Sequence, residues 1–133
     1  LNATIRKDSD KVAELVELAH SSYTSLLKYN DENALSCVIS LAYYSAQKNY
    51  TLHREMPAGK GFADIVFEPN RNCDLPALIV ELKWGHSAEE AVEQIKQKDY
   101  LDCLKNYSGE VLLVGVNYDK EKQHTCRIER TVI

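Results

Sequence analysis

The segment Ala77-Leu78-Ile79-Val80-Glu81-Leu82-Lys83 carries most of the information about the fold. Its apolar run is typical of a central strand that is covered on both faces. Strand alternation places Glu81 and Lys83 on one face and Leu82 on the other. Charged groups are costly to bury without a partner, and such groups tend to mark function. The segment therefore predicts the middle of a sheet with a polar site near its end.

A crossover to a second buried strand follows this segment. Gly85 ends the strand, and Ser87-Ala88-Glu89-Glu90 is a capping-box pattern that begins a helix expected to reach about Asn106. The next apolar run, residues 111–116, predicts another fully buried strand. Because a strand, a long helix and a strand form a β-α-β unit, we expect the two strands to be parallel. Residues 124–133 alternate enough for an edge strand.

The upstream residues predict two helices and two further strands. Apolar positions recur at helical spacing over residues 10–27 and again from Asn30 or Asp31 to about Lys48. Residues 50–56 and 62–67 read as strands on either side of a turn at residues 57–61. The predicted order is two helices, three strands, a helix and two strands. This is an α/β fold: a mixed central sheet flanked by helices, with an extra N-terminal helix and a C-terminal edge strand.

Length and composition indicate one soluble globular domain over residues 1–133. No apolar run approaches the roughly 20 residues that span a bilayer, so no membrane association is expected. The net charge of −4 counts mildly against a strong nonspecific nucleic-acid binder, but it does not exclude a nuclease. Because the chain begins at Leu1, we expect it to be a C-terminal fragment of a longer protein.

The cysteines have neither the spacing of a zinc site nor that of a disulfide framework. Reduced thiols in a cytoplasmic protein are therefore expected. The four cysteines are Cys37, Cys73, Cys103 and Cys126.

Asp64 on the preceding predicted strand completes a constellation with Glu81 and Lys83. If the two strands pair side by side, the carboxylates of Asp64 and Glu81 lie within ~5 Å, the cross-strand spacing. Two carboxylates at that distance repel each other unless a cation lies between them or one of them is protonated. Oxygen ligands of this kind suit Mg²⁺ or Mn²⁺. An isolated acid-x-lysine is otherwise most often a surface ion pair.

In their order along the chain, these residues resemble the PD-(D/E)xK nuclease superfamily. The resemblance covers about residues 31–117 and is closest to the bacterial branch found as a C-terminal domain behind an AAA-type ATPase module. It implies a restriction-endonuclease-like αβββαβ core. The matching positions are Glu32, Glu55, Gly61-Phe62-Ala63-Asp64, Glu81-Leu82-Lys83 and Gln94. Two positions depart from the family pattern: Ala63 replaces the proline, and Phe62 stands where this branch often has arginine.

The resemblance also implies a role for each matching residue. Asp64, Glu81 and the carbonyl of Leu82 would bind the cation, with Glu32 adding a carboxylate directly or through water. Lys83 would assist a water, activated by Mg²⁺ or Mn²⁺, that attacks a phosphodiester. Gln94 would orient groups near the site, and Glu55 would be an accessory acid. The implied partners are nucleic acid, DNA rather than RNA, and an ATPase domain in the same chain.

The residues also leave less specific readings open. Glu32 in a first helical turn fits the helix dipole alone, Gln94 fits a plain helix surface, and Glu55 fits a structural position. Lys60, His86, Lys98 and Tyr100 are possible nucleic-acid contacts, with solvated lysines and a core tyrosine as the ordinary alternatives. A non-catalytic nucleic-acid-binding or regulatory module is the alternative function. Glycoside hydrolysis fits poorly, because it does not call for a lysine two residues from an acid.

Overall fold

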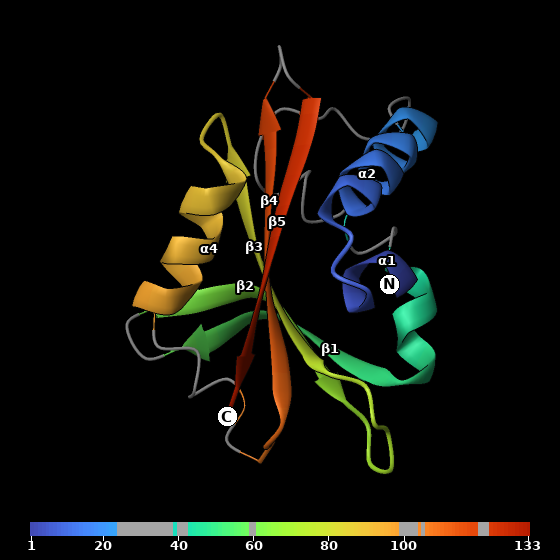
Figure 1. The fold of residues 1–133 in the computed structure, drawn as a ribbon, viewed down its shortest axis with the longest axis vertical. Helices are drawn as coiled ribbons and strands as arrows, with labels where there is room; N and C mark the ends of the chain where they lie inside the picture. The colour runs from blue at the N-terminus through green and yellow to red at the C-terminus, as the bar shows by residue number, and fades with distance from the viewer. Residues whose placement is uncertain (24–38, 40–42, 59–60, 99–103, 105, 120–122) are drawn as a thin grey trace.

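The computed structural model describes residues 1–23, 39, 43–58, 61–98, 104, 106–119 and 123–133. Its centre is a five-stranded sheet in the order β1-β2-β3-β4-β5 (Figure 1). The strands span β1 Tyr50–Ala58, β2 Gly61–Pro69, β3 Ala77–Trp84, β4 Glu110–Asp119 and β5 Gln123–Val132. β3 and β4 run parallel and every other neighbouring pair is antiparallel, so the predicted mixed sheet and its parallel crossover are confirmed.

Helices cover the two faces of this sheet. The short α1 (Asn2–Ile5) and α2 (Ser9–Tyr23) lie on one face, and α4 (Ala88–Gln97) lies on the other (Figure 1). The extra N-terminal helix and the C-terminal edge strand are thus present as predicted. Among the described helices, none is long and apolar enough to cross a membrane.

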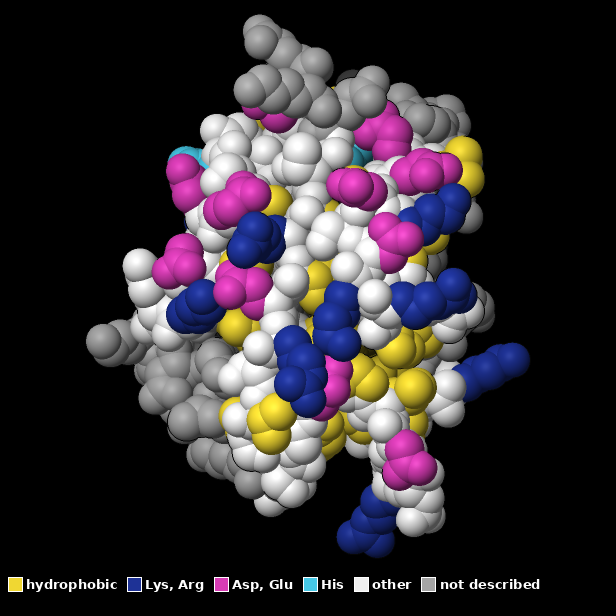
Figure 2. Space-filling view, in the orientation of Figure 1, with side chains coloured by type: hydrophobic (Ala, Val, Ile, Leu, Met, Phe, Trp, Pro, Cys, Tyr) yellow, Lys and Arg dark blue, Asp and Glu magenta, His cyan; other side chains and the backbone are white. Residues whose placement is uncertain are grey.

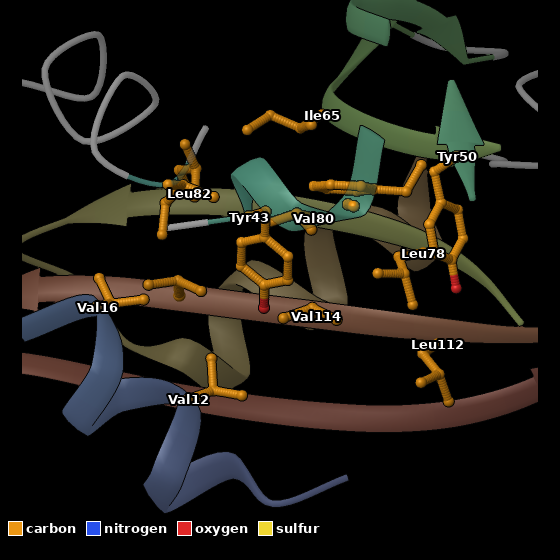
Figure 3. Packing of buried hydrophobic residues seen from close by; sticks show 14 residues of the cluster. Val12, Val16, Tyr43, Tyr50, Ile65, Leu78, Val80, Leu82, Leu112 and Val114 are labelled. Atoms are coloured by element: carbon orange, nitrogen blue, oxygen red, sulfur yellow. The ribbon is translucent and has the colours of Figure 1, made fainter. Parts of the chain in front are cut away.

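Two apolar clusters fill the space between the layers. The larger cluster joins α2 and the region around the 3₁₀ segment η1 (Tyr44–Lys48) to one sheet face, and Figure 3 shows its labelled members around Tyr43. The second cluster packs α4 against the opposite face through Val92 and Ile95. β3 contributes to both clusters, since Leu78 and Val80 belong to the first and Ile79 to the second. This two-sided burial is the reason for the continuous apolar run of β3.

The predicted helical segments compare as follows with the described residues. Most of the helix expected from Asn30 or Asp31 to about Lys48 lies outside them, and its described last part is the 3₁₀ segment η1 (Tyr44–Lys48), in which the amide of Ala46 donates to the carbonyl of Tyr43 at 2.8 Å. The helix expected to reach Asn106 ends at Gln97, because Lys98 is its C-cap and Leu104 is in a 3₁₀ turn. Helical periodicity alone does not encode where such a helix stops.

Candidate functional site

The candidate site lies where β2 and β3 stop pairing. Their antiparallel ladder ends at Ile65–Val80, and one further step would set Asp64 opposite Glu81. The ladder does not continue to that pair, and the backbone amide of Leu82 donates a hydrogen bond of 2.8 Å to Oδ2 of Asp64. The side chain of Asp64 is thereby held against β3, on the face covered by α4. The two acids that the sequence singled out thus come from adjacent strands.

Glu81 is a buried carboxylate with one satisfied oxygen. Its exposed fraction is 2%. Oε1 accepts a hydrogen bond from Nζ of Lys98 at 2.7 Å. Oε2 has no hydrogen-bond partner among the described residues. Because an unsatisfied buried carboxylate oxygen costs free energy, its presence points to a ligand that completes it.

Burial raises the pKa of both acids. Burial raises the pKa of Glu81 to about 7; the neighbouring Asp64 adds to the rise, while Lys98 and Lys83 oppose it. Burial also raises the pKa of Asp64, against the Leu82 amide and the two lysines, and the carboxylate of Glu55 adds to that rise. The surroundings therefore disfavour the form of the pair in which both carboxylates are ionised.

Lys83 and Gln94 line one open groove, whose lining residues do not include Asp64 or Glu81. The groove has a volume of about 460 Å³ and runs along α4. Its other lining residues are His86, Glu89, Glu90, Glu93 and Gln97. Figure 2 shows acidic side chains gathered over the upper half of the molecule, where α4 and α2 lie. The wall of the groove formed by α4 is therefore unfavourable for a phosphate backbone, whereas Lys83 provides a cation.

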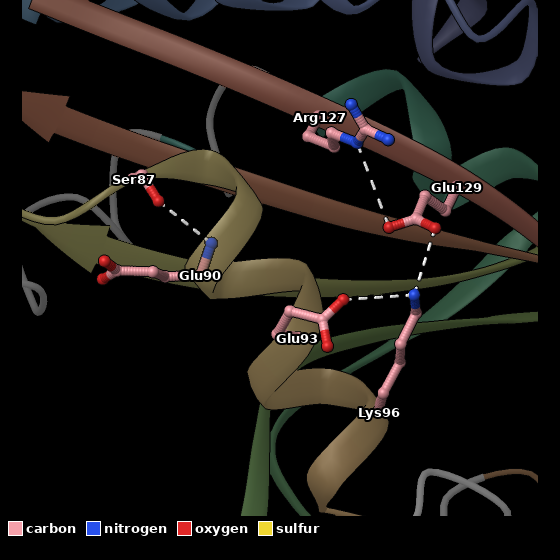
Figure 4. Close-up of polar contacts among 6 residues, drawn as sticks. All are labelled: Ser87, Glu90, Glu93, Lys96, Arg127 and Glu129. Carbon is pink, nitrogen blue, oxygen red and sulfur yellow. Dashed lines mark hydrogen bonds and ion pairs between the residues drawn. The ribbon is translucent and has the colours of Figure 1, made fainter.

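Close packing at β4 holds α4 over the site. Gly115 is opposite Glu81 in the parallel ladder, and a Cβ added there would lie 2.3 Å from the carbonyl oxygen of Ala88. Any side chain at this position would push the helix away from the sheet. At the start of the helix, Ser87 accepts a hydrogen bond of 3.0 Å from the amide of Glu90, as the capping-box pattern predicts (Figure 4).

A chain of ion pairs links the exposed side of α4 to β5. Lys96 contacts Glu93 at 3.3 Å and Glu129 on β5 at 3.1 Å, and Glu129 also lies 3.9 Å from Arg127 (Figure 4). Exposed pairs of this kind contribute little stability individually. Lys98, the C-cap of the same helix, makes its own ion pair with Glu81 on β3.

The remaining predicted residues fall into two groups. Glu32, Lys60 and Tyr100 lie outside the described residues. Of the others, His86 is exposed at the start of α4, where its Nδ1 lies 3.0 Å from Glu90. Glu55 is exposed on β1.

Lys98 has a contact that the sequence reasoning did not anticipate. Lys98, which the sequence offers as a possible nucleic-acid contact, forms an ion pair with Glu81, and its side chain is 19% exposed. A signal was available, because Lys98 follows Gln94 by one helical turn and therefore shares its face.

The two carboxylates fit a hard divalent cation. Asp64 and Glu81 carry oxygen atoms of the type that Mg²⁺ and Mn²⁺ prefer, and Oε2 of Glu81 has no hydrogen-bond partner among the described residues. Within the part of the chain that the structure describes, no three His, Cys, Asp or Glu side chains converge closely enough to hold a cation by themselves. Solvent or substrate oxygens would then fill the remaining positions, which is usual for Mg²⁺.

A mixed five-stranded sheet with helices on both faces, bearing an acid on one strand and an acid-x-lysine on the next, defines the restriction-endonuclease-like class of α/β fold. The chain belongs to the PD-(D/E)XK nuclease superfamily, whose family model matches residues 30–128. Members of this superfamily are generally nucleases that act on nucleic acid with divalent metals. A comparison with curated proteins found no match.

Proposed function

We propose that this domain hydrolyses phosphodiester bonds in nucleic acid with Mg²⁺ or Mn²⁺ held by Asp64 and Glu81. The observation that carries the proposal is the buried Oε2 of Glu81, which has no hydrogen-bond partner among the described residues and lies near a second carboxylate. A cation there would offset the repulsion between the two acids. The leading alternative, a non-catalytic binding module, draws support from the acidic groove wall and from Phe62 at the position of an expected arginine.

Each residue has a distinct task in this proposal. The bound cation supplies Lewis-acid polarisation of the phosphate and lowers the pKa of water. The Leu82 amide orients Asp64, and Lys98 fixes one oxygen of Glu81. Lys83, at the rim of the groove, orients the attacking water and stabilises charge on the phosphate.

The remaining sequence-derived residues and partners extend the proposal. Gln94 lines the same groove and would position the groups around the lysine, while Glu32 and the carbonyl of Leu82 would complete the ligands. We also propose DNA rather than RNA as the substrate. A cytoplasmic bacterial setting, a single domain at the C-terminal end of a longer chain and an AAA-type ATPase module in that chain complete the proposal.

Dependence on a divalent ion is the direct test of the proposed function. The protein is incubated with end-labelled duplex DNA, single-stranded DNA and RNA in millimolar Mg²⁺ or Mn²⁺, and in parallel with EDTA. Cleavage of DNA is expected with the ions and not with EDTA. Equal cleavage in EDTA would contradict the cation's role, and binding without cleavage in every condition would favour the non-catalytic module.

Cation binding should depend on pH because it competes with a proton on Glu81. Below the folded pKa of about 7 this carboxyl holds its proton, so each cation bound must release one. We expect Mn²⁺ to bind roughly tenfold more weakly for each pH unit below 7, and to raise the melting temperature more at pH 8 than at pH 6. Thermal unfolding across a Mn²⁺ titration at each pH measures this. A pH-independent shift would rule out Glu81 as the titrating ligand.

A further inference from the structure

We propose that the outer edge of β5 is an interface at which two copies of this chain pair antiparallel, so that two five-stranded sheets join into one. The two-fold axis of this pair passes beside Ile128 on β5. The inference goes beyond the proposed function, because it concerns the edge of the sheet opposite β1 and needs no cation.

The backbone groups of β5 that face away from β4 can be assigned from the ladder between these strands. Gly109 and Ile133 exchange both of their backbone hydrogen bonds, at 2.9 and 3.0 Å. From there the register continues without a break to Asp119–Gln123. In an antiparallel ladder, hydrogen-bonded pairs alternate with pairs that are not hydrogen-bonded. The residues of β5 whose amide and carbonyl point outward are therefore His124, Cys126, Ile128, Arg130 and Val132.

One end of this edge is closed by another part of the chain. Oε2 of Glu17 on α2 accepts a hydrogen bond from the outward amide of His124 at 3.3 Å, and it lies 2.5 Å from Nδ1 of the same residue. From Cys126 to Val132, the outward backbone groups have no hydrogen-bond partner among the described residues. Open backbone groups on an edge strand are a template on which a further strand can pair.

The open stretch is accessible from one side of the molecule. β5 lies on the side of the sheet nearest the viewer in Figure 1, with α4 and α2 to either side of it. Figure 2, in the same orientation, shows charged side chains of both signs on this side. On β5 itself, Val132 is 60% exposed and the side chain of Arg127 is 51% exposed. A second strand can therefore approach the edge.

The charges of β5 indicate that this second strand is another copy of β5. Arg127 and Glu129 alternate with Ile128, so they project from the same face of the sheet. When Ile128 pairs with Ile128 of the second copy, Arg127 stands opposite Glu129 of that copy, and the reverse pair forms on the other side of the axis. Opposite charges that face each other across two strands stabilise the pairing.

The same charges disfavour the neighbouring registers. A shift of the second copy by two residues would place Arg127 opposite Arg127, or Glu129 opposite Glu129, and like charges in that position repel. Charged residues on an edge strand commonly prevent pairing altogether. Here their signs are complementary under the two-fold axis, so they oppose the shifted registers and favour the one centred on Ile128.

The favoured register also satisfies the open backbone groups. Ile128 exchanges both hydrogen bonds with its counterpart, and Cys126 does so with Arg130 of the second copy, because all of these residues point their backbone groups outward. Val132 would come opposite His124, whose amide already donates to Glu17. The paired stretch therefore ends before Val132, where the closed end of the other copy begins.

Sedimentation velocity of the wild-type protein, over a micromolar to millimolar concentration series in EDTA, tests the pairing. The dimer fraction is expected to rise with protein concentration and to fall at high salt, because salt screens charges at a surface. A monomer at every concentration would overturn the inference. That result would leave the proposed cation site untouched, since no cation is present in this experiment.

Charge reversal at the two facing positions tests the register. Arg127→Glu leaves only carboxylates there and Glu129→Arg leaves only guanidinium groups, so each variant alone should associate at least about tenfold more weakly than the wild-type protein. An equal mixture of the two variants should form a heterodimer, because every facing pair then has opposite signs. Unchanged association of the single variants, or no recovery in the mixture, would overturn the inference.

Proline variants test the backbone hydrogen bonds separately from the charges. Arg130→Pro removes an outward amide inside the paired stretch, and Val132→Pro removes one beyond it. Neither amide bonds to β4, so both variants should fold, which circular dichroism checks. Arg130→Pro should lose the dimer. Val132→Pro should keep it, as should Lys96→Met, which removes the partner of Glu129 within the chain. Equal association of the two proline variants would contradict the pairing.

Discussion

Asp64→Asn and Lys83→Ala are each expected to reduce cation-dependent cleavage by at least about 100-fold while the fold is retained. The side-chain amide that Asp64→Asn introduces would keep an oxygen for the Leu82 amide, which donates to Oδ2 at 2.8 Å, but it loses the charge that attracts the cation. Lys83→Ala removes the ammonium at the groove rim without touching the carboxylates. Initial cleavage rates on end-labelled DNA, with circular dichroism for folding, measure both effects.

The two variants also differ from each other in a useful way. Asp64→Asn should weaken Mn²⁺ binding, whereas Lys83→Ala should leave binding close to that of the wild-type protein and affect cleavage only. Glu68→Gln on β2 and Lys96→Met on α4 are the matched controls, because they remove like charges that lie in ion pairs with His53, Glu93 and Glu129. If Asp64→Asn and Lys83→Ala cleave as fast as the controls, the assigned site is wrong.

Glu81→Gln is expected to abolish cleavage and yet to stabilise the metal-free protein at pH 8. Burial raises the folded pKa of Glu81 from 4.5 to about 7, so ionisation opposes folding. Such a group binds more protons folded than unfolded, and its contribution to stability therefore falls as pH rises from about 4.5 to 7. Removing the charge should raise the free energy of unfolding at pH 8 by about 1–3 kcal/mol.

Urea unfolding in EDTA at pH 8 and pH 5 measures this gain. The difference between Glu81→Gln and the wild-type protein should shrink as pH falls through 7 and nearly vanish below 4.5, where Glu81 is protonated in both states. Glu110→Gln is a control whose effect on the free energy of unfolding should have the opposite sign. In the wild-type protein the hydrogen bond from Arg130 lowers the pKa of Glu110, so the stabilising effect of this pair is present above the unfolded pKa and is lost in acid.

A loss of stability in Glu81→Gln at pH 8 would show that the pair with Lys98 outweighs the desolvation of the carboxylate. The expected gain would instead mark Glu81 as a residue that reduces the stability of the resting fold. Such residues are common where binding or catalysis needs a strained or under-satisfied group.

Local patterns were sufficient for most of the fold. The apolar runs of β3 and β4, with a capped helix between them, predicted a parallel pair, because a crossover of that length has one usual geometry. Alternation along β3 predicted that Glu81 and Lys83 share a face, since the side-chain period of a strand is fixed. The end of α4 was predicted too late, because helical periodicity does not specify a stop and Lys98 is held by Glu81 from another element.

The positions of the strands and the face that carries Asp64, Glu81 and Lys83 could be predicted from the amino-acid order, because they depend on short-range periodicity. The ion pair of Lys98 with Glu81, the lack of a partner for Oε2 among the described residues and the positive φ of Glu55 became visible only in the folded structure. Each of these arises from packing between segments distant in sequence or from strain imposed by neighbouring strands. No local pattern records such long-range constraints.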